Sequence, residues 1–170
     1  MDCLSIHFQA AVVCKRKISE SMRGYFSTFG GNPVACSIGL AVLRVLKNEK
    51  LRSSANNVGR ALASLFSNIK NKFSGRVGDI RGCGLIWAIE FISDSATKEP
   101  DPEFARLVVG LMRKKEKILL GLTGSHNHVI LFTPPLCFTV DNSRRYIHSI
   151  SKIFATMIFQ DLGLKAITKN

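Results

Sequence analysis

The sequence predicts an α+β fold, in which helices pack on one face of a small, mostly antiparallel sheet. Three observations predict this class. Apolar residues recur every three or four positions in the segments 33–47, 51–69 and 141–158, as they do along one side of a helix. The segment 76–92 is rich in β-branched and aromatic residues, and 117–135 holds two further apolar runs, so both predict strand pairs. The order is helix, helix, strand pair, helix, strand pair, helix.

The first predicted helix covers residues 33–47 and follows a tight entrance, "FSTFGGNP". Asn32 is a good N-cap, and Pro33 suits the first helical position because its missing N–H is not needed there. The apolar side of this helix carries Val34, Ile38, Ala41, Val42 and Val45. A second amphipathic helix has apolar positions at Leu51, Ala55, Val58, Leu62, Leu65 and Ile69.

The stretch "RVGDIRGCGLIWAIEFI" predicts two strands joined by a turn at Gly82 and Gly84. Cys83 lies in this apolar pattern and is predicted to be a buried thiol. We expect Asp79 and Arg81 to have a structural role, in support of the turn and a domain interface. Alternate side chains of the second strand share one face and are predicted core residues: Trp87, Ile89 and Phe91.

A polar loop, "SDSATKEPDP", separates this strand pair from the next helix. Pro102 suits a helix start, and the helix is predicted over 102–116 with inward residues Phe104, Leu107, Val108 and Leu111. "KILLGL" and "HVILFTPP" predict two more strands, the second ended by Pro134 and Pro135 because proline has no N–H to donate. Asp141 opens the last helix, whose apolar side is Ile147, Ile150, Ile153, Phe154, Met157 and Ile158.

The first thirty residues fit this order less well. "QAAVVC" has the composition of one strand, but no neighbouring strand is encoded before it. The chain is therefore expected to begin within a larger fold.

The composition excludes several classes of function. The 170 residues are 46% hydrophobic, enough to bury one core, and no apolar run reaches the roughly 18 to 20 residues that span a bilayer, so we expect no membrane partner. The formal net charge is +12, but the basic runs are short and scattered, and one tryptophan and two tyrosines offer little surface for stacking bases. We therefore expect no nucleic-acid partner.

Cysteines and histidines predict no metal site. The five cysteines are widely spaced and form no C-x-x-C pair, which favours a reducing compartment over disulfides or zinc. His126 and His128 have the i, i+2 spacing that presents two imidazoles on one side of a strand, but the sequence offers no third ligand. Cys137 lies in an apolar strand pattern and is predicted to be buried.

The entrance "FSTFGGNP" has two physical interpretations. A helix start leaves about four backbone N–H groups unpaired and carries roughly half a positive charge. Gly30 and Gly31 allow a ligand to approach the backbone, and Ser27 and Thr28 add hydroxyl donors, so the loop can bind a phosphate or a carboxylate. The alternative is a well-capped helix with no ligand, and local chemistry alone leaves both open.

Four segments resemble, in order and spacing, the class III (ornithine-type) pyridoxal-phosphate aminotransferases. They are "STFGGNPVACSIGLAVL", "NNVGRALASLF", "VGDIRGCGLIWAIEF" and "ILFTPPLCFTVDNSRR". The third resembles the family's specific G-D-x-R-G-x-G-L hairpin, with Asp79, Arg81, Gly82 and Gly84 in the motif positions. Within the class, "GSHNHVILFTPPLCFTVDNSRR" is most similar to the ethanolamine-phosphate and phosphohydroxylysine phospho-lyases, also named alanine-glyoxylate-aminotransferase-2-like proteins.

The resemblance implies part of a fold-type I enzyme with pyridoxal 5′-phosphate as cofactor. It implies that residues 1–31 are a remnant of the cofactor-binding large domain and that residues 32–73 are connecting helices. Residues 74–160 are then the C-terminal small domain, and residues 161–170 are a tail. The implied reaction is β-elimination of phosphate from ethanolamine phosphate or phosphohydroxylysine, or amino transfer. In the family this loop binds the cofactor phosphate of the other subunit of a dimer, which assigns that role to Ser27, Thr28, Gly30, Gly31 and Asn32.

Two departures from the family pattern concern activity. The family's Schiff-base lysine precedes the "AAVV" strand by about nine or ten residues, but residues 1–9 are "MDCLSIHFQ", and Lys15 and Lys17 lie beyond the strand. We therefore assign no catalytic residue and expect the chain alone to be inactive. Many class III transaminases also have an arginine before the Pro-Pro pair that binds the substrate carboxylate. Residues 129–133 contain no cation, which is compatible with an amine substrate that lacks a carboxylate and also with relaxed selection on an inactive fragment.

Three hypotheses from different classes follow. The chain is the C-terminal part of a phospho-lyase-like enzyme, or a non-catalytic protein that pairs with a full-length family member and lends it Ser27 and Thr28. The third hypothesis, a basic nucleic-acid binder, requires a steep salt dependence of binding. The resemblance also implies a homodimer or heterodimer, a small amine or amino-acid substrate, and a mitochondrial or cytoplasmic location. The first residues carry no convincing import or secretory signal.

Overall fold

The computed structural model describes residues 13–21, 24 and 26–167, with side chains described up to residue 158. The chain divides into two compact units, residues 1–50 and residues 51–170. Each unit is described by itself. No described helix is long and apolar enough to cross a membrane.

The first unit contains two helices, α1 (Arg16–Glu20) and α2 (Pro33–Asn48). The predicted helix over 33–47 is confirmed to within one residue. No residue of α2 is buried, and five of its large apolar side chains are between 47% and 64% exposed: Val34, Leu40, Val42, Leu43 and Val45. The predicted strand "QAAVVC" falls mostly outside the described residues, and its last two residues have irregular backbone.

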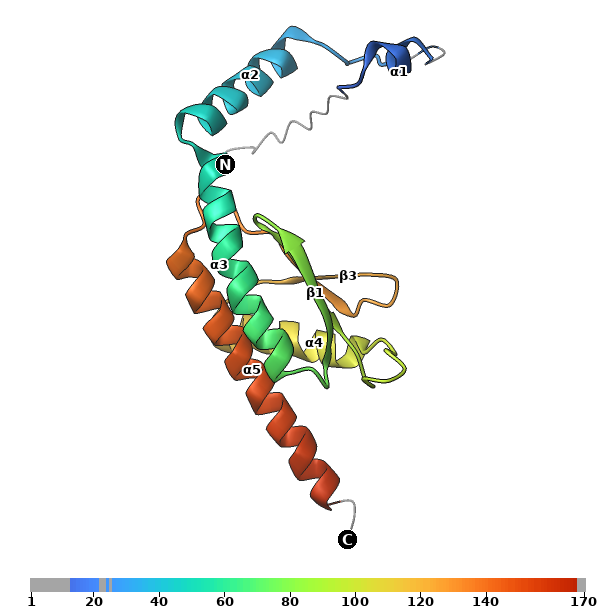
Figure 1. Ribbon diagram of the computed structural model, residues 1–170, viewed down its shortest axis with the longest axis vertical. Helices are drawn as coiled ribbons and strands as arrows, with labels where there is room; N and C mark the ends of the chain where they lie inside the picture. The colour runs from blue at the N-terminus through green and yellow to red at the C-terminus, as the bar shows by residue number, and fades with distance from the viewer. Residues whose placement is uncertain (1–12, 22–23, 25, 168–170) are drawn as a thin grey trace, which may run out of the picture. The chain divides into compact units, whose positions relative to one another are not determined.

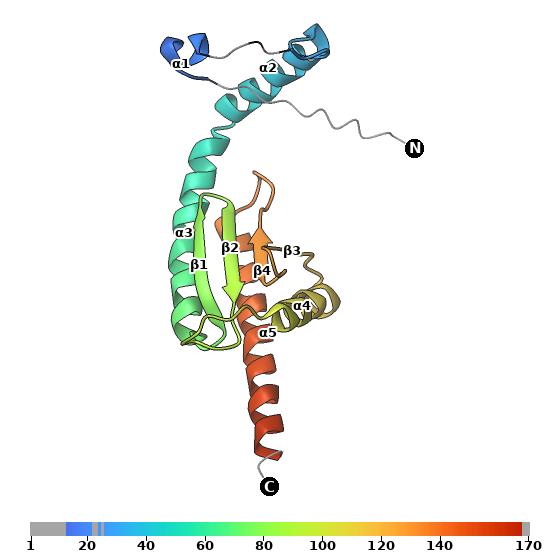
Figure 2. The same cartoon turned by 90° about the vertical axis from the view of Figure 1, so that its right-hand side faces the viewer.

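The second unit confirms the predicted α+β class. In chain order its elements are α3 (Leu51–Lys72), β1 (Val77–Cys83), β2 (Ile86–Phe91), α4 (Pro102–Leu111), the π-helix η1 (Met112–Glu116), β3 (Gly121–Thr123), β4 (Val129–Phe132) and α5 (Val140–Ile167). The four strands form one antiparallel sheet in the order β1-β2-β4-β3. Figure 1 shows α3 and α5 side by side, and Figure 2 shows them behind the sheet.

The strand register separates a covered face of the sheet from an open one. Trp87 and Ile89 of β2 pair with Phe132 and Ile130 of β4, and all four side chains are buried beneath the helices. The alternate positions form the open face, which carries Asp79, Arg81, Ala88, Glu90 and Leu131. In the described unit no helix covers this face, and these five side chains are half-buried or exposed.

Phe66 of α3 lies at the centre of the core and is 1% exposed. Its ring contacts those of Trp87, Phe132 and Tyr146 at centroid distances of 5.1, 6.4 and 6.3 Å. A second aromatic group is centred on Phe154, whose ring lies 5.3 to 6.2 Å from those of Phe73, Phe91 and Phe104. The helical spacing predicted Leu65 as a core residue and omitted Phe66. In the structure Phe66 is buried, whereas Leu65 is only half-buried.

Three predicted core residues are exposed. Cys83 ends β1 opposite the exposed Ile86, at a register position of the face away from Trp87 and Ile89. Cys137 is exposed because it follows the prolines in the loop before α5 rather than lying in a strand. Leu107 is 57% exposed because α4 packs against the core with the side that carries Phe104 and Val108. The predicted core positions Trp87, Ile89 and Phe91 are confirmed.

The helix predicted over 102–116 changes its winding at residue 112. α4 is regular to Leu111, η1 continues as a π-helix, and Lys117 ends it with φ 58°. Within η1, Glu116 accepts a hydrogen bond from Ser149 at 2.9 Å and pairs with Lys152 of α5 at 3.2 Å. The extra residue in this turn therefore places a carboxylate against α5.

We predict opposite outcomes for two buried hydroxyls. Tyr146 stacks on Phe132 at 4.3 Å, and its hydroxyl has no hydrogen-bond partner among the described residues. Burial raises the pKa of this phenol above its usual value. Tyr146→Phe removes an unsatisfied polar group, so the free energy of unfolding should stay the same or rise by about 1 kcal/mol.

The matched control is Ser149→Ala, which deletes a buried hydroxyl that donates to Glu116. It should lower the free energy of unfolding by about 1 kcal/mol. Denaturant unfolding of both variants measures the difference. A loss of stability in Tyr146→Phe as large as that in Ser149→Ala would show that the phenol has a partner.

Candidate functional site

α2 begins with a complete N-terminal cap. Asn32 has extended backbone, and its Oδ1 accepts a hydrogen bond from the Ala35 N–H at 2.9 Å. Its Nδ2 donates to the Phe29 carbonyl at 2.8 Å, and Pro33 occupies the first helical turn. Both ends of the Asn32 carboxamide are therefore used within the loop, so this residue holds the loop in shape.

The residues before the cap form a tight turn with free hydroxyl groups. Ser27 Oγ accepts a hydrogen bond from the Gly30 N–H at 3.0 Å, and a Cβ on residue 30 would lie 2.9 Å from that oxygen. Gly31 has φ +72°, a conformation that favours glycine. Within the described residues no hydrogen bond engages the Thr28 side chain, which is exposed. Ser27 keeps its hydroxyl hydrogen for donation, and Thr28 keeps its whole hydroxyl.

This loop has the chemistry to bind a phosphate. Ser27 and Thr28 present hydroxyl donors just before the positive end of a sixteen-residue helix whose first turn holds no acidic side chain. The loop is exposed, so an anion can reach it. The phosphate group of pyridoxal phosphate therefore fits the donor set of this loop.

The β1–β2 hairpin meets α3 through glycines. Gly84 turns the chain with φ +57°, and a Cβ on Gly59 of α3 would lie 2.6 Å from the Gly84 Cα. A Cβ on Gly82 would lie 2.5 Å from the Trp87 ring. The Trp87 indole N–H donates to the Gly84 carbonyl at 2.9 Å. The motif glycines thus let α3 approach the turn and position Trp87.

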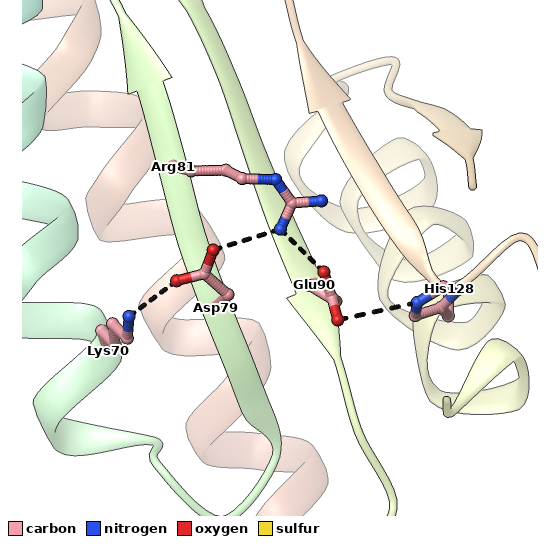
Figure 3. A network of polar contacts seen from close by, with 5 residues as sticks. All are labelled: Lys70, Asp79, Arg81, Glu90 and His128. Atoms are coloured by element: carbon pink, nitrogen blue, oxygen red, sulfur yellow. Dashed lines mark hydrogen bonds and ion pairs between the residues drawn. The ribbon is translucent and has the colours of Figure 1, made fainter. Parts of the chain in front are cut away.

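Asp79 and Arg81 belong to a polar network on the open face. Figure 3 shows the five side chains, which come from α3, β1, β2 and the loop before β4. Asp79 binds Lys70 at 2.7 Å and Arg81 at 3.1 Å, and Arg81 also binds Glu90 at 2.7 Å. His128 Nε2 lies 3.9 Å from a Glu90 oxygen. Arg81 therefore joins one carboxylate on each of two neighbouring strands.

The network shifts the pKa of two of its members. The hydrogen bond from Lys70, with a further one from Arg81, holds the pKa of Asp79 below its usual value. The hydrogen bond to Glu90, followed by that to Asp79, raises the pKa of Arg81. Sequence reasoning missed Lys70 and Glu90 as partners. Glu90 lies opposite Asp79 in the strand register, so a pairing of the two strands was the signal that could have found it.

The His126 and His128 side chains lie close together in the loop before β4. Their ring centroids are 5.7 Å apart, and His126 Nδ1 lies 2.9 Å from Ser125 Oγ. In the part of the chain that the structure describes, no group of three His, Cys, Asp or Glu side chains is placed to hold a metal ion. His128 is buried, and its Nδ1 has no hydrogen-bond partner among the described residues.

Comparison with known proteins identifies the family of this fold. The sequence profile described as "Aminotransferase class-III" matches residues 7–154. The chain belongs to the class III aminotransferase family. It spans about a third or less of the length of the curated relatives that it matches. One, "Ethanolamine-phosphate phospho-lyase homolog 1" of Caenorhabditis elegans, is 34% identical over 151 residues, 87% of this chain and 32% of the relative.

Other relatives are named as aminotransferases. "Alanine--glyoxylate aminotransferase 2-like" of Drosophila melanogaster is 34% identical over 83% of this chain and 29% of the relative. "Alanine--glyoxylate aminotransferase 2 homolog 2, mitochondrial" of Arabidopsis thaliana is 40% identical over 71% of this chain and 25% of the relative. The family resemblance expected from the sequence is therefore confirmed.

Solved structures agree with the observed fold. A phospholyase from Arthrobacter, in complex with phosphoethanolamine, is 32% identical, with a TM-score of 0.68 over 77% of this chain and 31% of that one. An aminotransferase from Bacillus anthracis is 29% identical, with a TM-score of 0.66 over 84% and 34%. The class III chain thus has the α+β fold of the matching part of these structures.

Leu131 occupies the open face of the class III sheet, between Ala88 of β2 and Gly121 of β3. It is 39% exposed, and it lines an apolar cavity with Leu119, Pro134 and Pro135. No cation of the described residues lines this cavity. Where the resemblance expected a carboxylate-binding arginine, the structure therefore presents an aliphatic surface.

The contact between α3 and the hairpin predicts a large effect for one glycine. Gly59→Ala places a methyl group against backbone atoms of Gly84, which cannot move as a side-chain end can. We expect the free energy of unfolding to fall by about 1–3 kcal/mol. The control is Gly110→Ala in α4, where no atom lies within 4 Å of the added Cβ. This change should raise stability by up to about 1 kcal/mol. Equal effects in thermal unfolding would contradict the predicted contact.

The network predicts a specific pH dependence. Because the pKa of Asp79 is lowered in the folded state, its contribution is complete above the ordinary value near 3.8 and is lost as pH falls through the lowered pKa. Asp79→Asn should flatten this acid limb of the stability curve. At neutral pH it should cost less than about 1 kcal/mol, since the Asp79 and Lys70 side chains are 38% and 45% exposed.

The control for this pH dependence is Asp141→Asn, which removes an 85% exposed carboxylate bonded to Arg144. Unfolding by denaturant at a series of pH values compares the variants. Identical acid limbs in Asp79→Asn and the unmodified chain would show that the network does not contribute.

Proposed function

We propose that this chain supplies the small domain and the phosphate-binding loop of a pyridoxal-phosphate-dependent class III enzyme. The enzyme removes phosphate from a small phosphorylated amine. The unengaged Thr28 hydroxyl, exposed in the capped turn before α2, is the observation that carries the proposal. A helix that needed only a cap would be complete with Asn32, and Thr28 would then have no role.

Each residue of the loop has a distinct role in this proposal. Thr28 and Ser27 donate their hydroxyl hydrogens to the cofactor phosphate of the partner subunit. Gly30 and Gly31 keep the turn tight, and Asn32 fixes it on α2. When bound, pyridoxal phosphate supplies an electron sink for the carbon beside the substrate amine.

The substrate proposed is an amine without an α-carboxylate, such as ethanolamine phosphate. The cavity that Leu131 lines has no cation to bind a carboxylate. A curated relative is named for ethanolamine phosphate, and a solved relative was crystallised with phosphoethanolamine. Phosphohydroxylysine and amino transfer are the alternatives within the same family.

We further propose that the 170 residues are inactive alone and act in a dimer with chains that carry the Schiff-base lysine. Residues 1–9 include no lysine, which supports the first part. The compartment proposed is mitochondrial or cytoplasmic, and two relatives, from Arabidopsis thaliana and Pongo abelii, have names that place them in mitochondria.

The test joins the chain to the upstream part of the Caenorhabditis elegans relative. We expect the chimera to bind pyridoxal phosphate and to release phosphate from ethanolamine phosphate, whereas the separate chain does neither. Thr28→Val should weaken cofactor binding about tenfold, because it deletes a hydrogen bond to a charged group. Absorbance titration of the cofactor gives this affinity without an activity measurement.

The matched control is Thr123→Val in β3, an exposed position where valine suits a strand. It should leave cofactor affinity and phosphate release unchanged. Turnover of ethanolamine phosphate by the separate 170 residues would refute the proposed inactivity. Equal effects of the two Thr→Val changes would refute the role of Thr28.

A second candidate function is a non-catalytic subunit that pairs with a full-length family member. The exposed apolar side of α2 favours it, because such a surface is stable in water only when a partner covers it. Native mass spectrometry of the chain mixed with a full-length relative tests this candidate. A heterodimer with unchanged catalytic rate supports it, and two separate species exclude it.

A further inference from the structure

A cavity of about 610 Å³ lies between the first half of α3 and the β1–β2 turn. Asn56, Asn57 and Arg60 line it from α3, and Cys83 and Trp87 line it from the hairpin. All of its lining residues belong to the unit 51–170. Its volume is within the range of small-molecule sites in proteins.

Internal hydrogen bonds already engage two of the acceptors at this cavity. Arg60 Nη2 donates to Asn57 Oδ1 at 2.5 Å, so the Asn57 carboxamide is left with its two N–H donors. The Gly84 carbonyl accepts from the Trp87 indole. The polar groups left to face the cavity are thus mostly donors, namely the remaining Arg60 N–H groups, the Asn57 amide, the Asn56 carboxamide and the Ser53 hydroxyl.

The charge at the cavity is positive and uncompensated. Arg60 is exposed and has no carboxylate partner among the described residues, and no acidic side chain lines the cavity. Arg81 of β1 differs from Arg60 in this respect, because its guanidinium is paired with two carboxylates, those of Asp79 and Glu90. The bond to Asn57 also orients the Arg60 guanidinium before any ligand arrives, which lowers the entropy cost of binding.

We propose that this cavity binds a small oxyanion, a phosphate or a carboxylate group, on Arg60 and Asn57, with the edge of Trp87 as its apolar wall. Arginine suits both groups because its parallel N–H donors match two oxygens at once. This site uses none of the residues of the loop before α2, so it is independent of the proposed cofactor contact.

The chain contains a built-in reporter for this site. Trp87 is its one tryptophan and lines the cavity, so its indole N–H gives a single resonance in a ¹⁵N NMR spectrum. We would titrate the 170-residue chain with inorganic phosphate and with acetate, at constant ionic strength set by sodium chloride. Saturable shifts with phosphate identify a phosphate site, and saturable shifts with acetate alone identify a carboxylate site. No saturation with either anion overturns the proposal.

The variants test whether Arg60 carries the binding. Arg60→Gln should weaken anion affinity about tenfold or more. Arg60→Lys should give an intermediate loss, because lysine keeps the charge but lacks the parallel N–H donors of the guanidinium. The matched control, Arg52→Gln, removes an exposed charge from the same helix outside the cavity and should change affinity less than twofold. Equal losses in Arg60→Gln and Arg52→Gln would mean general attraction to a basic surface and would overturn the proposal. Circular dichroism confirms that each variant is folded.

Discussion

The close approach of α3 to the β1–β2 turn is the constraint on which the rest of the second unit depends. Gly59 and Gly84 meet backbone to backbone, and the Gly84 carbonyl then holds the Trp87 indole. With Trp87 fixed, Phe66 has a ring to pack against and the sheet has a defined position under α3 and α5. The same approach leaves the donor-lined cavity beside it. The motif glycines therefore act through packing rather than through chemistry.

The sheet separates two kinds of interaction. Its covered face is an aromatic core, while its open face carries charges that neutralise one another across α3, β1 and β2. The Arg81 guanidinium on this face is already paired with the carboxylates of Asp79 and Glu90. The surface at Leu131 is aliphatic, and the charges of the described network are paired with one another.

Periodicity predicted the elements well and the side-chain partners poorly. α2, α3 and the hairpin follow the expected ranges because each has a cap, a long apolar repeat or a glycine turn. The spacing of apolar residues could not show that Phe66 is more deeply buried than Leu65. Which of these two adjacent residues lies deeper depends on how α3 is rotated against Trp87. Cys83 was expected in the core because an apolar run does not show which of its residues lie on the open face of the sheet.

The candidate site was predictable to a similar degree. The capped turn of residues 27–32 was predicted from the sequence, because two glycines followed by Asn-Pro are typical of a turn that leads into a helix. That Asn32 is fully engaged while Thr28 is not became clear only from the hydrogen bonds. The exposed apolar side of α2 adds a final consequence. The described core lies within the second unit, whereas no residue of α2 is buried, so a surface that bound α2 would stabilise it. The rate at which a protease cuts within 33–50 should therefore fall when another protein binds α2.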